Sequence, residues 1–183
     1  MPASKPKPTP LARMSPRGRS ELARLEGRVL RAYNDVAGLK TIGVGHLLTR
    51  DELDTGLIRI NGEMVRWRAG ISVAQSTALL DQDLVKHEAA VSNLIVRILE
   101  QHQFDALVSF CFNVGKSAFG NSTLRRIINA GDLAGVPAQF RRWIRAGGST
   151  VPGLQTRREA EIAMWEGPGT VGADNAPRKG YWA

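Results

Sequence analysis

Two carboxylates with unlike neighbours lie close together in the first fifth of the sequence. Glu26 follows Leu25 in an apolar helical pattern, and Asp35 comes nine positions later in a polar turn beside Asn34. Hydrolysis of a glycosidic bond needs one carboxylic acid that protonates the leaving oxygen and one carboxylate that activates water or attacks the sugar. The pair is therefore a candidate catalytic centre, with Glu26 as general acid and Asp35 as general base.

The surroundings of the two carboxylates support this division of roles. Apolar neighbours favour the protonated form of Glu26, whereas a polar turn favours ionised Asp35. Thr41 follows on the predicted return strand, where its hydroxyl can hold the water that Asp35 deprotonates. The spacing alone is weak evidence, because the 17 acidic residues of the chain form many such pairs by chance.

These side chains need elements that bring them together. An apolar stripe predicts a short helix that begins after Ser15 or Ser20 and ends at Gly27. Alternating apolar residues over 29–46 predict a hairpin, and Asn61-Gly62 between two apolar runs predicts another. The two carboxylates would thus lie at a helix end and in the turn that follows it.

Beyond residue 70 the apolar pattern is helical. Ser72 and Gln75 have the spacing of a capping box that opens a long helix. Residues 104–114 are apolar nearly all round, which is typical of a buried helix. Further helices are predicted at 122–130, 132–146 and 156–165.

The composition favours one folded domain. The 183 residues are 43% hydrophobic and 23% charged, which excludes a disordered or fibrous class and permits a sizeable core. No apolar run approaches the roughly 20 residues of a membrane span, so we expect no transmembrane segment. We expect a monomer.

The formal net charge of +8 predicts attraction to a polyanion such as nucleic acid, anionic lipid or an anionic cell envelope. The sequence has no recognised DNA-reading motif, so we do not expect a nucleic-acid partner. Basic residues are spread along the chain, and a basic surface without a specific partner is the alternative. The densest basic cluster, which would meet envelope polymers or form the solvated faces of two helices, is Arg141, Arg142, Arg145, Arg157 and Arg158.

Metal and cofactor chemistry is not indicated. Cys111 is the single cysteine and lies among apolar residues, which predicts a buried free thiol. His46, His87 and His102 lack metal-ligand spacing. Gly43-Val44-Gly45 lacks the third glycine of a phosphate-binding loop. We therefore expect no metal and no cofactor.

A long segment around the two carboxylates resembles the active-site segment of the phage-type lysozymes, or endolysins. It comprises Glu26-Gly27, Tyr33-Asn34-Asp35 and the run 38–49. The resemblance covers about residues 20–166 and continues at 104–110, Asn113-Val114-Gly115, Ser122-Thr123-Leu124, Trp143, Pro152-Gly153-Leu154 and 157–161. It implies a muramidase that hydrolyses the bond between N-acetylmuramic acid and N-acetylglucosamine in peptidoglycan, with inversion.

The resemblance also implies an α+β, lysozyme-like fold. A small β-rich N-terminal lobe and a larger helical C-terminal lobe would be joined by a long helix, with the active-site cleft between them. We expect a basic, Pro-rich, flexible tail and then a single domain, divided as tail 1–18, domain 19–183, β-rich lobe about 28–70, helical lobe about 72–166 and irregular C-terminal tail 167–183.

The same resemblance assigns site residues. It gives the role of the acid to Glu26, that of the base to Asp35 and that of the water-positioning threonine to Thr41. Substrate contacts map to Leu47, Phe112 and Ser122. His46 is expected to pair with Asp83 on the long helix as structural support.

Two other functions compete with hydrolysis. A lytic transglycosylase cleaves the same bond without water and needs no base, so the presence of Asp35 and Thr41 argues against it. A non-catalytic cell-wall-binding module has no need of two unlike carboxylates.

The beginning of the chain bears on where the protein is made. Residues 1–17 contain five prolines and no apolar run typical of a signal peptide. We therefore expect synthesis in the host cytoplasm without a signal peptide, followed by release to the cell wall for host lysis.

Overall fold

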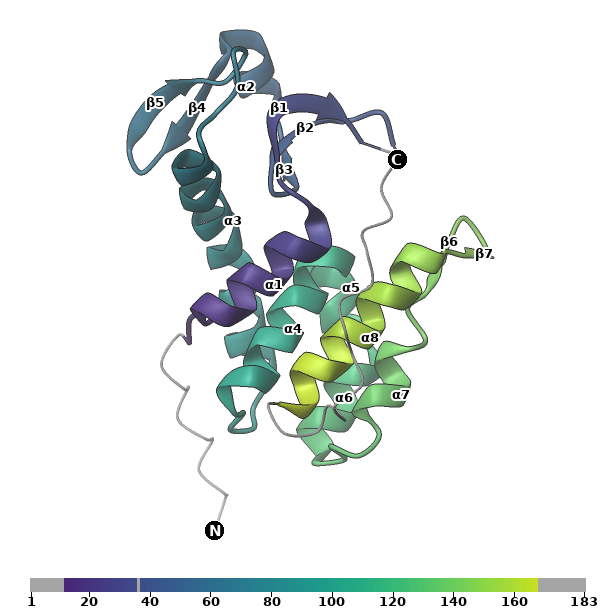
Figure 1. Ribbon diagram of the computed structural model, residues 1–183. Helices are drawn as coiled ribbons and strands as arrows, with labels where there is room; N and C mark the ends of the chain where they lie inside the picture. The colour runs from purple at the N-terminus through teal and green to yellow at the C-terminus, as the bar shows by residue number, and fades with distance from the viewer. Residues whose placement is uncertain (1–11, 36, 168–183) are drawn as a thin grey trace. The chain divides into compact units, whose positions relative to one another are not determined.

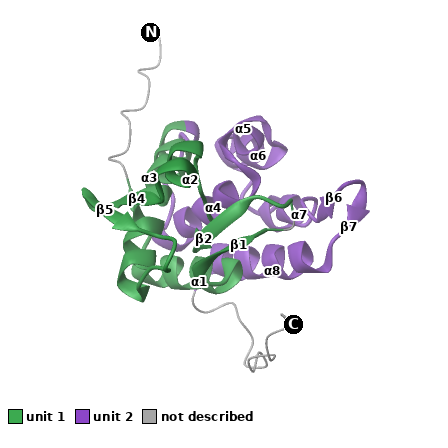
Figure 2. Cartoon of the chain, turned by 90° about the horizontal axis from the view of Figure 1, so that it is seen from above, with its two compact units in different colours: residues 1–93 green, residues 94–183 purple. Residues whose placement is uncertain are grey.

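A long helix, α3 (Val73–Leu94), organises the first part of the chain. The computed structural model describes residues 12–35 and 37–167 (Figure 1) and divides the chain into two compact units, residues 1–93 and 94–183 (Figure 2). The predicted capping box opens α3, because the Ser72 amide donates to Gln75 Oε1 at 2.8 Å and the Gln75 amide donates to Ser72 Oγ at 3.1 Å. The boundary between the units falls at the end of α3, so the long helix belongs to the first unit.

Helix α1 (Pro16–Glu26) begins earlier than the expected end of the tail at residue 18. The Ser15 side chain accepts from the Gly18 amide and Pro16 occupies the first turn, two features that start a helix. Upstream of them, Met14 is buried and its amide donates to Glu88 Oε1 at 2.8 Å. Part of the segment expected as a tail, from Met14 onward, is thus ordered by α1 and by this contact; residues 1–11 lie outside the described residues.

The predicted hairpin over 29–46 is a three-stranded antiparallel sheet in the order β1–β2–β3. Its strands are β1 (Val29–Asn34), β2 (Lys40–Gly43) and β3 (His46–Leu47). Tyr33 pairs with Thr41 between the first two strands, and Thr41 pairs with Leu47 on the third. The turn that carries Asp35 therefore lies at the end of β1, as predicted.

The Asn61-Gly62 hairpin is confirmed. It joins β4 (Leu57–Ile60) to β5 (Glu63–Arg66), and both turn residues have positive φ angles of 50° and 87°, as a two-residue turn with this sequence requires. A short helix before it, α2 (Arg50–Thr55), was not predicted. None of its six residues is buried, so no apolar periodicity marks it in the sequence.

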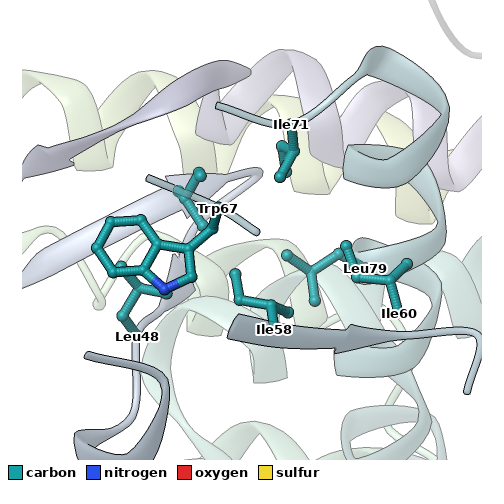
Figure 3. Close-up of a cluster of buried hydrophobic side chains, with 7 residues drawn as sticks. Leu48, Ile58, Ile60, Trp67, Ile71 and Leu79 are labelled. Carbon is teal, nitrogen blue, oxygen red and sulfur yellow. The ribbon is translucent and has the colours of Figure 1, made fainter. Parts of the chain in front are cut away.

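Both sheets of the first unit share one apolar core with α3. Figure 3 shows this cluster, with Trp67 and Leu48 at one side and Leu79 of α3 at the other. Its buried members are Ile42, Leu48, Ile58, Ile60, Trp67, Ile71 and Leu79. Because removing an apolar side chain from water is the main favourable term in folding, this core fixes the strands against the beginning of α3.

The second unit is mainly helical. Its elements are α4 (Gln101–Val114), α5 (Lys116–Asn121), α6 (Thr123–Ala130), α7 (Val136–Phe140), β6 (Arg145–Ala146), β7 (Ser149–Thr150) and α8 (Pro152–Glu166). The expected helix over 132–146 is wrong: α7 has five residues, and a β6–β7 hairpin follows it. Gly147 and Gly148, both at positive φ, form the turn of that hairpin, which explains why the chain leaves the helical path.

Helix α4 is the centre of the second unit, buried continuously from Phe104 to Cys111. The Phe110 ring meets three other aromatic rings edge to face, at centroid distances of 5.2 to 6.3 Å: Phe119, Phe140 and Trp143. Cys111 is a buried free thiol, as predicted, and burial raises its pKa to about 12. The all-round apolar pattern of 104–114 thus correctly identified a buried helix.

The observed elements form the expected α+β class of fold, with most strands in the first unit and most helices in the second. Among the residues that the structure describes, no helix has the length and apolar character to cross a membrane. The irregular tail expected after Gly167 lies outside the described residues.

Candidate functional site

Glu26 is the last residue of α1, and the helix ends there for a local reason. Gly27 follows with φ of 76° and ψ of 159°, a conformation that breaks the helix and that glycine adopts without a side-chain clash. The Glu26 side chain is partly exposed. The predicted acid therefore sits at the helix end, where the chain turns into β1.

The carboxylate of Asp35 is held by the backbone of its own turn. Its Oδ1 atom accepts from the amides of Ala37 at 2.9 Å and Leu39 at 2.8 Å. Two backbone bonds close the same turn, from the Asp35 amide to the Leu39 carbonyl and from the Gly38 amide to the Asp35 carbonyl, both at 2.9 Å. This arrangement fixes one carboxylate oxygen, and no group of the described residues hydrogen-bonds to the other, Oδ2.

Thr41 and Asp35 are linked through one residue. The Thr41 hydroxyl donates to the carbonyl of Leu39 at 3.2 Å, and the Leu39 amide is the one that binds Asp35 Oδ1. The Thr41 side chain is buried. The predicted base and the predicted water-positioning threonine therefore hydrogen-bond to the same residue, Leu39.

Tyr33 connects the two carboxylates electrostatically. Its pKa is raised, first by partial burial and then by the negative charges of Glu26 and Asp35. Tyr33 also faces Thr41 across the β1–β2 ladder. Both predicted catalytic carboxylates thus contribute to the pKa of Tyr33, a residue whose sequence position indicates no role.

His46 makes the predicted contact with Asp83 and a second one that was not predicted. Its Nδ1 atom lies 2.7 Å from Asp83 Oδ2 on α3, and its Nε2 atom lies 3.3 Å from Glu52 Oε2 on α2. Burial lowers the pKa of His46, but the hydrogen bond and charge of Asp83, together with Glu52, outweigh it and raise the pKa above its usual value. The imidazole therefore ties β3 to two helices. Glu52 was missed because α2 itself was missed.

The three predicted substrate contacts lie in different settings. Leu47 is exposed on β3 as the cross-strand neighbour of Thr41. Phe112 lies in the last turn of α4 and is partly buried. Ser122 is buried and caps α6, since its hydroxyl donates to the Phe119 carbonyl at 2.7 Å and accepts from the Arg125 amide at 3.0 Å. A role in substrate binding stays a prediction for all three.

Only three of the five arginines in the expected basic cluster are exposed at the protein surface. Arg157 and Arg158 are buried and pair with Glu161 on the same helix, at 3.1 Å each. Arg141 is exposed but paired with Glu159, while Arg142 and Arg145 are exposed. Two adjacent arginines on a helix can thus belong to the core, which charge counting does not reveal.

Trp143, one of the positions that carry the resemblance, packs edge to face on Phe110. Trp67 and Trp165 are buried, in line with a packing role, and Trp182 lies outside the described residues. Within residues 12–35 and 37–167, no group of three or more histidine, cysteine, aspartate or glutamate side chains is arranged to bind a metal ion.

The chain is similar to one group of known proteins. The family model described as phage lysozyme matches residues 23–161. The chain is 40% identical over 147 residues to the SAR-endolysin of Escherichia phage Mu, covering 80% of this chain and 77% of that protein. It is 39% identical over 155 residues to the endolysin of Salmonella phage P22, covering 85% and 99%. The crystal structure of a point mutant of P22 lysozyme superposes with a TM-score of 0.70 at 35% identity, covering 85% of this chain and 99% of that one.

Proposed function

The chain belongs to the phage lysozyme family, and from that membership and the geometry of the first unit we propose that Glu26, Asp35 and Thr41 carry its reaction. The protein is a phage endolysin of the muramidase class, a glycoside hydrolase that acts on peptidoglycan.

In the proposed reaction Glu26 gives its proton to the glycosidic oxygen as the bond from that oxygen to the anomeric carbon breaks. Asp35 takes a proton from a water molecule, and the water oxygen forms the new bond to the anomeric carbon from the opposite face. Thr41 accepts a hydrogen bond from that water. The product carries an inverted anomeric centre, and exchange with solvent returns the proton to Glu26 and removes the one on Asp35.

One observation carries this assignment: Glu26 and Asp35 flank β1, the strand that carries Tyr33, and the negative charges of both contribute to the raised pKa of that tyrosine. The Asp35 turn adds support, because the two amides that hold Oδ1 leave Oδ2 to receive a proton.

The test is product analysis of purified peptidoglycan digested with the wild type, Glu26→Gln and Asp35→Asn. We expect reducing N-acetylmuramic acid ends from the wild type, with the new anomer opposite to the substrate's in proton NMR, and a loss of rate of at least about 100-fold in each variant. Glu21→Gln is the matched control, since Glu21 lies on the same helix and pairs with Arg24 at the surface. Anhydro ends, or full activity of Asp35→Asn, would remove the base from the mechanism.

We also propose that the enzyme works as a monomer drawn to the anionic envelope by its charge. The net charge of +8 supports this, because opposite charges raise the rate of encounter and salt screens the attraction. Sedimentation gives the mass in solution, and wall lysis measured from 50 to 500 mM salt is expected to slow as salt rises. A dimer, or lysis indifferent to salt, would contradict the proposal.

Synthesis in the host cytoplasm, before release to the wall, is the last part of the proposal. Cys111 is a buried free thiol, which suits a reducing compartment. Fractionation of cells that express the full chain tests it: activity is expected in the cytoplasmic fraction until the membrane is permeabilised. Activity that appears outside the membrane without permeabilisation would contradict this route.

A further inference from the structure

Arg28 ties the end of α1 to the beginning of α3. Its Nη1 atom donates to the Val73 carbonyl at 3.0 Å and to the Thr77 hydroxyl at 2.8 Å. The Thr77 hydroxyl in turn donates to the same Val73 carbonyl at 3.0 Å. The Arg28 guanidinium therefore hydrogen-bonds to the Val73 carbonyl and to the Thr77 hydroxyl, which are also hydrogen-bonded to each other. These bonds hold the Arg28 side chain at the first turn of α3.

The end of α1 needs such a tie. Glu26 is the terminal helical residue, and terminal turns fray because their last carbonyls lack intrahelical partners. Gly27 follows, and glycine is the residue with the greatest backbone freedom. Apart from the two neighbouring residues of the chain, no described atom lies within 4 Å of where a Gly27 Cβ would stand, so packing against other segments does not restrain this position.

A backbone contact two residues after Arg28 holds β1 next to the segment that leads into α3. The Leu30 carbonyl accepts from the Ile71 amide at 2.8 Å, just before α3 begins. Between Glu26 and this backbone contact, the Arg28 side chain holds the chain to α3.

Helix α3 also supports the sheet that leads to Asp35 and Thr41. His46 on β3 binds Asp83 of α3, and Gly43 on β2 approaches so closely that an added Cβ would lie 3.3 Å from Ser76 Oγ. The sheet thus positions Asp35 and Thr41 relative to α3, and Arg28 positions Glu26 relative to the same helix.

We propose that Arg28 is a positioning residue that fixes the Glu26 carboxyl relative to Asp35 by anchoring the segment after α1 on Val73 and Thr77. This inference rests on the proposed role of Glu26 as the acid. Catalytic groups must be held close to the productive geometry, and a displacement of about 1 Å can cost roughly 100-fold in rate. Arg28 contributes this precision without contacting the substrate.

The primary test compares Arg28→Ala with Arg31→Ala. Both variants remove one positive charge, and Arg31 is exposed on β1 with no hydrogen bond to any of the described residues. On soluble glycan strands we expect Arg28→Ala to lower kcat roughly 10- to 100-fold with KM within about twofold. We expect Arg31→Ala to stay within about twofold of the wild type in both constants. Equal kinetics of the two variants would overturn the inference.

The Thr77 side of the contact separates positioning from a general loss of structure. Thr77→Val removes the hydroxyl at constant charge and is expected to lower kcat in the same direction, whereas Thr77→Ser retains the hydroxyl and is expected to restore it. The double variant Arg28→Ala with Thr77→Val is expected to lose no more than Arg28→Ala alone, because both changes break one interaction. Additive losses in kcat, or an unchanged kcat in Thr77→Val, would contradict the inference, and Thr77→Val keeps the test open should Arg28→Ala fail to fold.

Circular dichroism melting of each variant identifies a folding defect. The outcome also separates this inference from the proposed function. If Glu26→Gln is inactive while Arg28→Ala matches Arg31→Ala, the acid assignment stands and the positioning role falls. If Glu26→Gln keeps its activity, the proposed function itself fails.

Discussion

The two units use ion pairs in different ways. In the first unit His46, Asp83 and Glu52 form a cluster whose side chains are 12 to 17% exposed and come from three separate elements. In the second unit Arg157 and Arg158 pair with Glu161 inside one helix, and the three side chains are 7%, 0% and 0% exposed. The first cluster can exchange protons with solvent, while the second is enclosed in the core.

The difference in exposure follows from which elements each ion-pair cluster joins. The histidine cluster joins β3 to α2 and α3 and so supports the strands that lead to the proposed catalytic turn. The arginine cluster joins α8 to α4: the Ser109 hydroxyl donates to Glu161 Oε1 at 2.9 Å, and the Arg158 guanidinium lies 4.9 Å from the centroid of the Phe110 ring. Buried charges are costly unless they are paired, so each charge of the arginine cluster depends on the presence of its partners.

The largest effect is therefore expected from breaking the buried cluster. Glu161→Gln keeps the side-chain shape but removes the negative charge that Arg157 and Arg158 share. Losing one partner of a buried ion pair costs about 3 to 5 kcal/mol, because the other charge stays buried and uncompensated. Urea unfolding at neutral pH, followed by circular dichroism, is expected to give a loss of that size.

Glu159→Gln is the control for this substitution, since Glu159 lies on the same helix at the surface. A loss in Glu161→Gln as small as the loss in the control would mean that the buried charges are already compensated by other groups. The ion-pair clusters of the two units would then differ in exposure but not in how much they stabilise the fold.

The histidine cluster is expected to have a smaller effect that depends on pH. The folded-state pKa of His46 is raised, so its stabilisation is fully present below the unfolded-state value of about 6.5 and is lost as pH rises through the folded-state value. The free energy of unfolding of the wild type, minus that of His46→Gln, should therefore fall as pH rises above about 6.5.

Urea unfolding at a series of pH values measures this difference, and NMR of the His46 ring measures the titration directly. Asp83→Asn should flatten the dependence more than Glu52→Gln, because the contact of Asp83 is shorter. A His46 ring that titrates at or below its ordinary pKa would show that burial wins over the two carboxylates.

Local signals in the sequence predicted the parts of the fold that depend on neighbouring residues. Gly27 as a helix end, Ser72 with Gln75 as a cap, and Asn61-Gly62 as a hairpin turn all act within a few residues, and all were confirmed. The short helix α2 and the β6–β7 hairpin were missed because neither buries an apolar stripe that a pattern could reveal.

For the candidate site, the resemblance supplied what local signals could not, including one long-range contact. Spacing and resemblance pointed to Glu26, Asp35 and the contact of His46 with Asp83. The contact of Arg28 with Thr77 spans 49 positions and was not predicted, since an arginine in a basic chain looks like any other. Long-range polar contacts depend on which segments pack together, and that information is not local to either residue.

The smallest effect is expected from the exposed pair of Arg141 and Glu159. The pair is bidentate, at 2.8 and 2.9 Å, and its hydrogen bond lowers the pKa of Glu159. Both side chains are more than half exposed, so water and salt screen the attraction. We expect Arg141→Gln to lower the free energy of unfolding by less than about 1 kcal/mol at neutral pH, and by less still in 0.5 M salt. Because the pKa of Glu159 is lowered in the folded state, the contribution is present above the ordinary glutamate pKa of about 4.3 and should be lost as pH falls through the lower folded-state value. A loss comparable to that of Glu161→Gln would mean that exposure does not govern how these ion pairs contribute, and the comparison between the two kinds of cluster would fail.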